Sequence, residues 1–166
     1  MRSRPALPAP CGSSTGGGTY DKSFLRHVDA TGAVLETRAL PRPLNDWLIA
    51  VKGSDVWVTL MGDDGPSELV RVPATGPPIT YPTPNLAVNG VASAGGRAVW
   101  FTAMTYDEDA LVVGRMRPDG EMRVFRRTFP APYVYDIEFD AARRILWISA
   151  TTYGQDPCHL VRMDLS

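Results

Sequence analysis

Short strings that alternate bulky and polar residues recur along the chain, and three of them carry a tryptophan at the same place. Alternation with a period of two residues predicts a short β-strand. The tryptophans are 43 and then 47 residues apart, and a period of this length indicates a repeat architecture. The three strings are Val56-Trp57-Val58-Thr59, Val99-Trp100-Phe101-Thr102 and Leu146-Trp147-Ile148-Ser149.

Glycine turns repeat with the same period. Gly32, Gly76 and Gly120 are each 44 residues apart and close turns rich in Asp, Thr and Pro. Glycine supplies the positive φ that such turns need. Five residues before each glycine lies an imidazole or guanidinium side chain, and a fourth basic residue continues the series near the end. These residues are His27, Arg71, Arg115 and Arg162.

One repeat unit can be written as four strands. They are β-branched and aromatic-rich, and Gly, Pro, Asp and Asn bound them. The first strand is expected at 47–51, 90–94 and 135–139, and the second is the tryptophan string. The third is expected at 68–72, 111–116 and 159–163, and the fourth at 79–81 and 122–125. A partial first unit supplies 24–28 and 34–37.

A four-stranded meander that repeats every 40–50 residues is typical of a β-propeller blade. The sequence therefore predicts an all-β fold of four-stranded antiparallel blades, about three plus a partial one, in an incomplete ring. Two regions are expected: a flexible Gly/Ser/Pro-rich tail at 1–22 and a partial propeller domain at 23–166. The tryptophans are expected to pack between blades, because each buries a large area.

The best copy of the unit runs through Asn89-Gly90-Val91, Val99–Thr102, Val113-Gly114-Arg115-Met116 and Asp119-Gly120. It resembles the propeller repeat of the virginiamycin B lyase (streptogramin lyase) family, over about residues 24–166. The resemblance implies a propeller. It would also imply metal-dependent opening of a cyclic depsipeptide ester by elimination, with histidine and glutamate in the central site.

The histidines do not match that active site. His27 occupies the slot that arginine fills in the other units, which indicates a structural role. His159 follows Cys158 on a predicted strand, where neighbours face opposite sides. There is no Glu-x-His pair. The fold is therefore carried over from the resemblance and the catalytic residues are not.

Three blades are too few to close a ring, because complete propellers have about 4–8. Two explanations follow. The chain is a fragment of a longer propeller, which is the preferred one, or two copies join as a homodimer that completes the ring.

Composition narrows the class of partner. The chain has 17 basic and 18 acidic residues, so no nucleic-acid partner is expected. No apolar run is long enough for a transmembrane segment. Cys11 precedes a Gly/Ser run, as in a bacterial lipoprotein, although the segment before it is short and interrupted by prolines. If Cys11 marks a truncated lipoprotein start, the protein belongs to the cell envelope or is extracellular; otherwise it is cytoplasmic.

Oxygen-bearing side chains lie eleven residues before each tryptophan, where the first strand begins. Asp46, Asn89 and Asp136 would share the mouth of the channel, and their oxygens suit Mg²⁺ or Ca²⁺. Alternatively they cap turns, as Asp and Asn often do.

Aromatic and acidic loops follow the second strands and open on the same edge. Their candidate residues are Asp63, Tyr106, Asp107 and Tyr153, which could bind a small molecule, a sugar or a peptide. Two functions remain open: a non-catalytic binding or scaffold module, or a metal-dependent lyase or hydrolase completed by further or partner blades.

Overall fold

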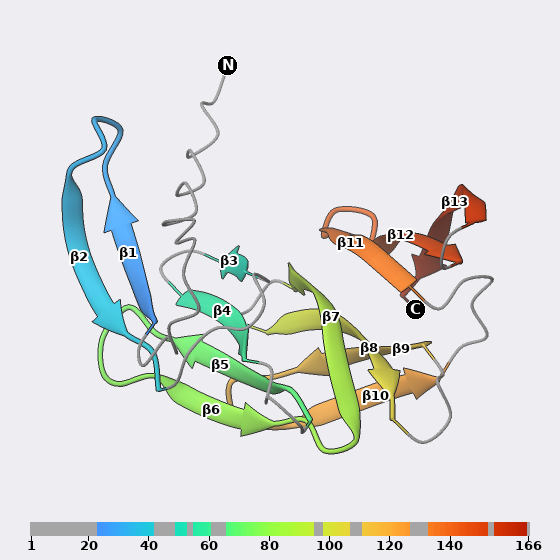
Figure 1. Cartoon of the computed structure of the whole chain (residues 1–166), viewed down its shortest axis with the longest axis horizontal. Helices are drawn as coiled ribbons and strands as arrows, with labels where there is room; N and C mark the ends of the chain where they lie inside the picture. Colours follow the sequence, from blue (N-terminus) through green and yellow to red (C-terminus); the bar gives the residue numbers. More distant parts are fainter. Residues whose placement is uncertain are drawn as a thin grey trace. The chain divides into compact units, whose positions relative to one another are not determined.

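The computed structural model describes residues 23–41, 49–52, 55–60, 66–94, 98–106, 111–126, 133–152 and 155–165. Within these ranges the regular structure is β-strand throughout (Figure 1). The chain divides into two compact units, Met1–Pro43 and Leu44–Ser166.

The first unit contains an antiparallel hairpin of β1 (Phe24–Val28) and β2 (Val34–Ala39). Its turn closes on Gly32, whose φ is +87°. The Asp29 carboxylate accepts hydrogen bonds from the Thr31 amide at 2.8 Å, the Thr31 hydroxyl at 2.7 Å and the Ala33 amide at 3.0 Å. These bonds favour the ionised carboxylate and lower the pKa of Asp29.

The described residues of the second unit form three antiparallel meanders, which we call the first, second and third blades. The strands pair in chain order within each blade. The first blade is β3 (Ile49–Lys52), β4 (Asp55–Leu60), β5 (Glu68–Val72) and β6 (Ile79–Pro82). The second is β7 (Leu86–Ser93), β8 (Val99–Thr105), β9 (Leu111–Met116) and β10 (Met122–Arg126). The third is β11 (Tyr133–Asp140), β12 (Ile145–Thr152) and β13 (Gln155–Asp164).

Two hydrophobic cores join consecutive blades. The core between the first and second blades contains Trp57 with Val88 and Phe101, and the core between the second and third contains Trp100 with Ile137 and Ile148. The innermost strand of the second blade, β7, contacts both β3 and β11. This arrangement confirms the prediction of an all-β fold built from propeller blades.

Some strands begin earlier than the sequence predicts. Strand β7 starts at Leu86 instead of Gly90, because a bulge at Asn89 lets the ladder with β8 continue past it. Strand β13 starts at Gln155 instead of His159. Strand β3 is described from Ile49, so the predicted start at residue 47 lies outside the described residues.

Candidate functional site

A tryptophan and an arginine stand opposite each other on neighbouring strands of every blade. The register pairs Trp57 with Arg71, Trp100 with Arg115 and Trp147 with Arg162. Directly opposite residues on a sheet share a face. We call the side of each blade that carries this pair its Trp face.

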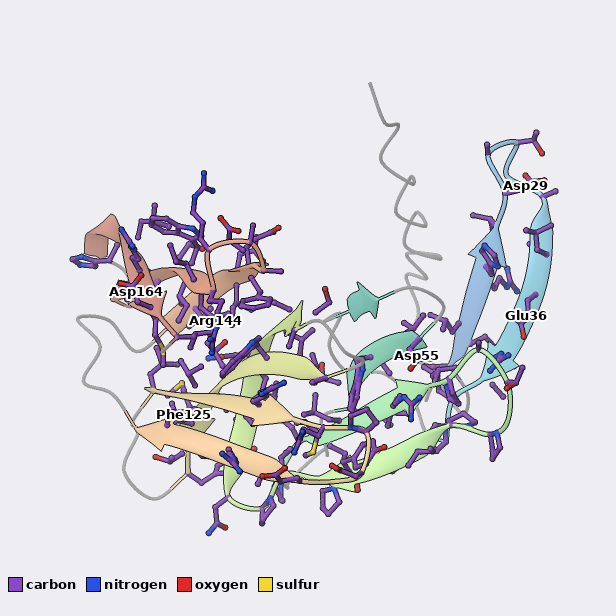
Figure 2. The ribbon with its side chains drawn as sticks, turned by 180° about the vertical axis from the view of Figure 1, so that it is seen from behind. Asp29, Glu36, Asp55, Phe125, Arg144 and Asp164 are labelled. Carbon is purple, nitrogen blue, oxygen red and sulfur yellow. The ribbon has the colours of Figure 1, made fainter. Side chains whose placement is uncertain are left out.

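In the first blade the arginine is buried in an ion pair. Arg71 donates to the Asp55 carboxylate from Nε at 3.0 Å and from Nη2 at 2.7 Å, and both residues are buried (Figure 2 labels Asp55). Burial by itself would lower the pKa of the Arg71 guanidinium. Interactions with the Asp55 carboxylate and with Tyr81 outweigh that effect, so the pKa is raised.

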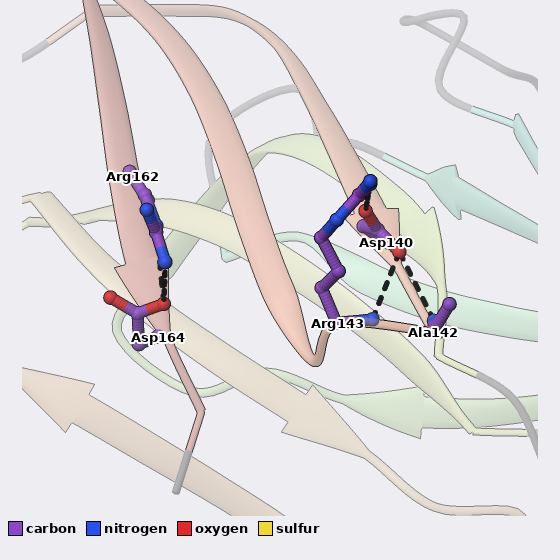
Figure 3. Close-up of polar contacts among 5 residues, drawn as sticks. All are labelled: Asp140, Ala142, Arg143, Arg162 and Asp164. Carbon is purple, nitrogen blue, oxygen red and sulfur yellow. Dashed lines mark hydrogen bonds and ion pairs between the residues drawn. The ribbon is translucent and has the colours of Figure 1, made fainter.

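In the other two blades the arginine at the equivalent position has a different partner. The Arg115 guanidinium lies 5.7 Å from the centre of the Trp100 ring, a cation–π geometry. Arg162 is exposed and donates to the Asp164 carboxylate at 2.7 Å from Nη2, as Figure 3 shows. Arg71 and Arg115 therefore have partners inside their blades, whereas Arg162 pairs at the surface.

The Trp face of the third blade is open, unlike the other two. Trp57 and Trp100 are 0% and 6% exposed, whereas Trp147 is only half-buried. Two residues before the arginine, Leu69 and Val113 are fully buried, but Leu160 is 69% exposed. Each of the first two Trp faces is covered by the following blade.

The open face consists of two rows that cross β11, β12 and β13. One row is Asp136–Ser149–Leu160 and the other is Glu138–Trp147–Arg162. We call these six residues the open blade face. On β7 of the second blade, the register positions that match Asp136 and Glu138 hold the buried Gly90 and Ala92.

That difference gives the open blade face its chemistry. Gly90 leaves no room for a larger residue, because a Cβ there would lie 2.5 Å from Thr102 Oγ1 and 3.0 Å from Ile137 Cγ2. Asp136 and Glu138 are exposed carboxylates instead. The face therefore carries two carboxylates on β11, and Trp147 and Leu160 beside Ser149 and Arg162 on β12 and β13.

Two of the predicted channel residues, Asn89 and Asp136, are described, and they occupy different register positions in their blades. Asn89 sits at the β7 bulge with no partner residue on β8, whereas Asp136 pairs with Ser149. The Asp136 carboxylate accepts a hydrogen bond from the Ile137 amide at 2.9 Å. Asp46 lies outside the described residues. Strand β11 has a bulge at the equivalent place, between Val134 and Asp136, but its connection to β12, counted from the tryptophan to its partner, is one residue longer than the β7–β8 connection, so equal sequence distance from a tryptophan is not equal position.

Of the predicted loop residues, Tyr106 is described. Its ring is 53% exposed, and its amide donates to the Asn85 carbonyl at 3.2 Å. Asp63, Asp107 and Tyr153 lie outside the described residues.

The two histidines lie on separate strands. His27 is exposed opposite Glu36 on the hairpin, and His159, on β13, is half-buried opposite Ala150 of β12. Among the residues that the structure describes, no three His, Cys, Asp or Glu side chains come together as metal ligands would.

The sequence did not single out Leu160 and Glu138. Leu160 could have been found by its offset, because it lies two residues before Arg162, as Leu69 does before Arg71. Its exposure could not, since only the packing shows which Trp face the described residues leave uncovered.

Three solved structures share the arrangement of strands. A chain of the nidogen/laminin complex matches 84% of this chain with a TM-score of 0.58 and 18% identity. Streptogramin B lyase matches 86% with a TM-score of 0.55 and 18% identity. TolB from Acinetobacter baumannii matches 81% with a TM-score of 0.56 and 16% identity. No family model and no curated protein matches the sequence.

These likenesses identify the fold as that of β-propeller proteins, including streptogramin B lyase, which the repeat motif resembles. The chain spans about half of the first two structures, 52% and 48% of their lengths, and 33% of the third. Within its described residues, no helix has the length and apolar character needed to cross a membrane.

Proposed function

We propose that this chain is a β-propeller binding or scaffold module that receives a protein partner on its open blade face. The supporting observation is the exposure of Leu160, which contrasts with complete burial of its counterparts Leu69 and Val113. Covering a sheet face that has an exposed leucine and a half-buried tryptophan with another protein surface is favourable, because it removes apolar area from water.

The character of the face favours a protein surface over a small molecule. The six residues lie on three adjacent strands of one sheet. Small-molecule sites are usually concave and enclose most of the ligand. A sheet face instead matches the way in which each blade of this chain packs against the next.

A photo-reactive amino acid at position 160 tests the proposal. The full chain is made in cells with the probe at Leu160 and, as a control, at Val124, an exposed residue of β10 (39%). A discrete protein adduct, identified by mass spectrometry, is expected from position 160 and not from 124. No protein adduct, or equal labelling from both positions, would contradict the proposed function.

A further inference from the structure

We propose that the β9–β10 hairpin of the second blade binds a phosphate group between three arginine side chains. They are Arg115 on β9, Arg117 directly after that strand, and Arg123 on β10. The site uses no residue of the open blade face. It therefore adds a small anionic ligand to the protein partner proposed above.

The three arginines line one hollow together with a single glutamate. The hollow has a volume of about 180 Å³, and its lining is Arg115, Arg117, Glu121 and Arg123. Glu121 accepts a hydrogen bond from Arg117 and another from Arg123 Nε at 2.7 Å. Three guanidinium groups and one carboxylate leave the lining with an excess of two positive charges. The Asp119 carboxylate lies outside the lining, where it accepts the Glu121 amide at 3.0 Å, and counting it lowers the excess to one.

Arg115 carries hydrogen-bond donors that no acceptor meets. Its guanidinium lies 5.7 Å from the centre of the Trp100 ring, and its Nε–H is buried without a partner. Among the described residues, no carboxylate pairs with Arg115. Because Nε is shielded from solvent, a ligand would bind the terminal nitrogens of this guanidinium, while the contact with Trp100 helps to hold it in place.

Two of the arginines face each other across the strands. The register of β9 and β10 places Arg115 directly opposite Arg123. Like charges at directly opposite positions destabilise a sheet. Glu121 offsets the charge of Arg123 but forms no bond with Arg115. An anion between the two guanidinium groups would replace this repulsion with attraction, and guanidinium groups bind phosphate oxygens through paired hydrogen bonds.

The first blade shows that the fold does not require this charge cluster. There Arg71 is opposite Ile79, at the position that Arg123 occupies in the second blade. The partner of Arg71 is Asp55, two residues before the tryptophan, and the second blade has Ala98 at that position. The second blade therefore lacks the acid and adds a base.

The third blade leads to the same conclusion from the other side of the arginine. Arg162 pairs with Asp164, two residues further along the strand. The second blade has Arg117 at the corresponding position. Residues that every blade needs for packing recur with the period of the chain. The additional arginines do not recur, and this supports a role in binding.

The number of donors favours phosphate over a carboxylate. Each guanidinium group has five N–H donors, whereas a carboxylate has two oxygens. A phosphate monoester has three acceptor oxygens and a charge of about −1.5 to −2 at pH 7, which matches the excess of two positive charges in the lining. A free phosphate ion and the phosphate group of a small molecule share this chemistry.

Isothermal titration calorimetry of the full chain with inorganic phosphate, at constant ionic strength, tests the proposal. We expect saturable binding at one site per chain and weaker binding of acetate. Arg115→Met keeps an apolar side chain beside Trp100 but removes the donors, and it should raise the dissociation constant at least about tenfold. Arg115→Lys keeps the charge without the planar group and should also bind more weakly than the wild type.

Two further variants change exposed parts of the site, so that folding is not at risk. Arg123→Met replaces a side chain that is 69% exposed, and it should also weaken phosphate binding. Glu121→Gln removes the carboxylate that competes for Arg117 and Arg123, and it should tighten binding. Circular dichroism confirms that each variant is folded.

Arg143→Met is the matched control. Arg143 is 75% exposed and pairs with Asp140 in another blade, so its loss should leave the dissociation constant unchanged. Absence of saturable phosphate binding, or equal weakening by Arg143→Met and Arg115→Met, would overturn the proposal. An alkyl phosphate monoester distinguishes the sources of the ligand. Binding as tight as that of inorganic phosphate supports a phosphorylated small molecule, and much weaker binding supports the free ion.

Discussion

Arg71 has an arginine as its counterpart in the second blade, but its partner Asp55 has no acidic counterpart there. In the second blade the residue two before the tryptophan is Ala98, and Arg115 lies over Trp100. In the first blade that residue is Asp55, which accepts both donors of Arg71 and lies 3.4 Å from the Ala74 amide. The same slot therefore holds a buried ion pair in one blade and a cation–π contact in the next.

The buried ion pair predicts a strong effect from a single substitution. Arg71→Met leaves the Asp55 carboxylate buried without its partner, and this should lower the free energy of unfolding by about 3–5 kcal/mol. The double variant Arg71→Met/Asp55→Ala should be less destabilised than that single variant, because no uncompensated charge remains. Urea unfolding measures both.

Arg123→Met is the control for this prediction. Arg123 is exposed and pairs with Glu121 at the surface, so its loss should change the free energy of unfolding by about 0–1 kcal/mol. If Arg71→Met lowered the free energy of unfolding no more than Arg123→Met does, the ion pair would not be needed for stability.

Backbone hydrogen bonds hold the strands of each blade together, and aromatic packing joins one blade to the next. Trp57 stacks on Tyr81 of its own blade, with ring centres 5.3 Å apart. The Tyr81 hydroxyl donates to the Pro118 carbonyl of the second blade at 2.7 Å. Trp100 contacts Phe125 of its own blade and Phe139 of the third, with ring centres 5.9 and 6.3 Å away.

The tryptophans should therefore differ in their contribution to stability. Trp100→Ala removes packing between two blades and should cost about 3–5 kcal/mol. Trp147→Ala removes a half-buried ring and should cost clearly less, when the free energy of unfolding is measured at concentrations where the chain is monomeric. Equal losses would show that the Trp face of the third blade is covered within one chain.

Most elements follow from local sequence, and the site does not. Strand β9 has the predicted bounds, 111–116, because a β-branched run there ends at a glycine turn. Gly76 and Gly120 have the predicted positive φ, +91° and +89°. The β7 bulge at Asn89 was not predictable, since one extra residue leaves no trace in the hydrophobic pattern.

The open blade face was not predictable for a different reason. Leu160 lies between His159 and Val161 in a run that predicts a strand, as a buried residue would, and its exposure depends on what packs against that strand. Period and spacing predict that each blade has an apolar face. They do not predict which element packs against that face.

At the scale of the whole molecule, turns far apart in the chain each hold a carboxylate whose pKa is lowered by hydrogen bonds. Hydrogen bonds from Thr31 lower the pKa of Asp29, and hydrogen bonds from Arg117 and then Arg123 lower the pKa of Glu121. The Arg143 side chain and amide lower the pKa of Asp140, as the contacts in Figure 3 show.

These lowered pKa values predict a loss of stability in acid. A carboxylate with a lower pKa in the folded state stabilises the fold above its unfolded pKa, near 4, and loses that contribution as pH falls through the folded value. The melting temperature should therefore fall steadily as the pH is lowered below 4. Asp140→Asn should melt below the wild type at pH 7, and the difference should shrink towards pH 2. A difference independent of pH would contradict this origin.

The sequential covering of the Trp faces also has a consequence for biosynthesis. While the chain emerges from the ribosome, the face that contains Trp57 stays uncovered until Leu86, Val88 and Val91 arrive, because these residues complete its core. The face that contains Trp100 waits in turn for Ile137 and Phe139. Each newly made blade thus has an exposed apolar face until the next blade is synthesised. A pause in translation between two blades would prolong the exposure of that blade's tryptophan to chaperones.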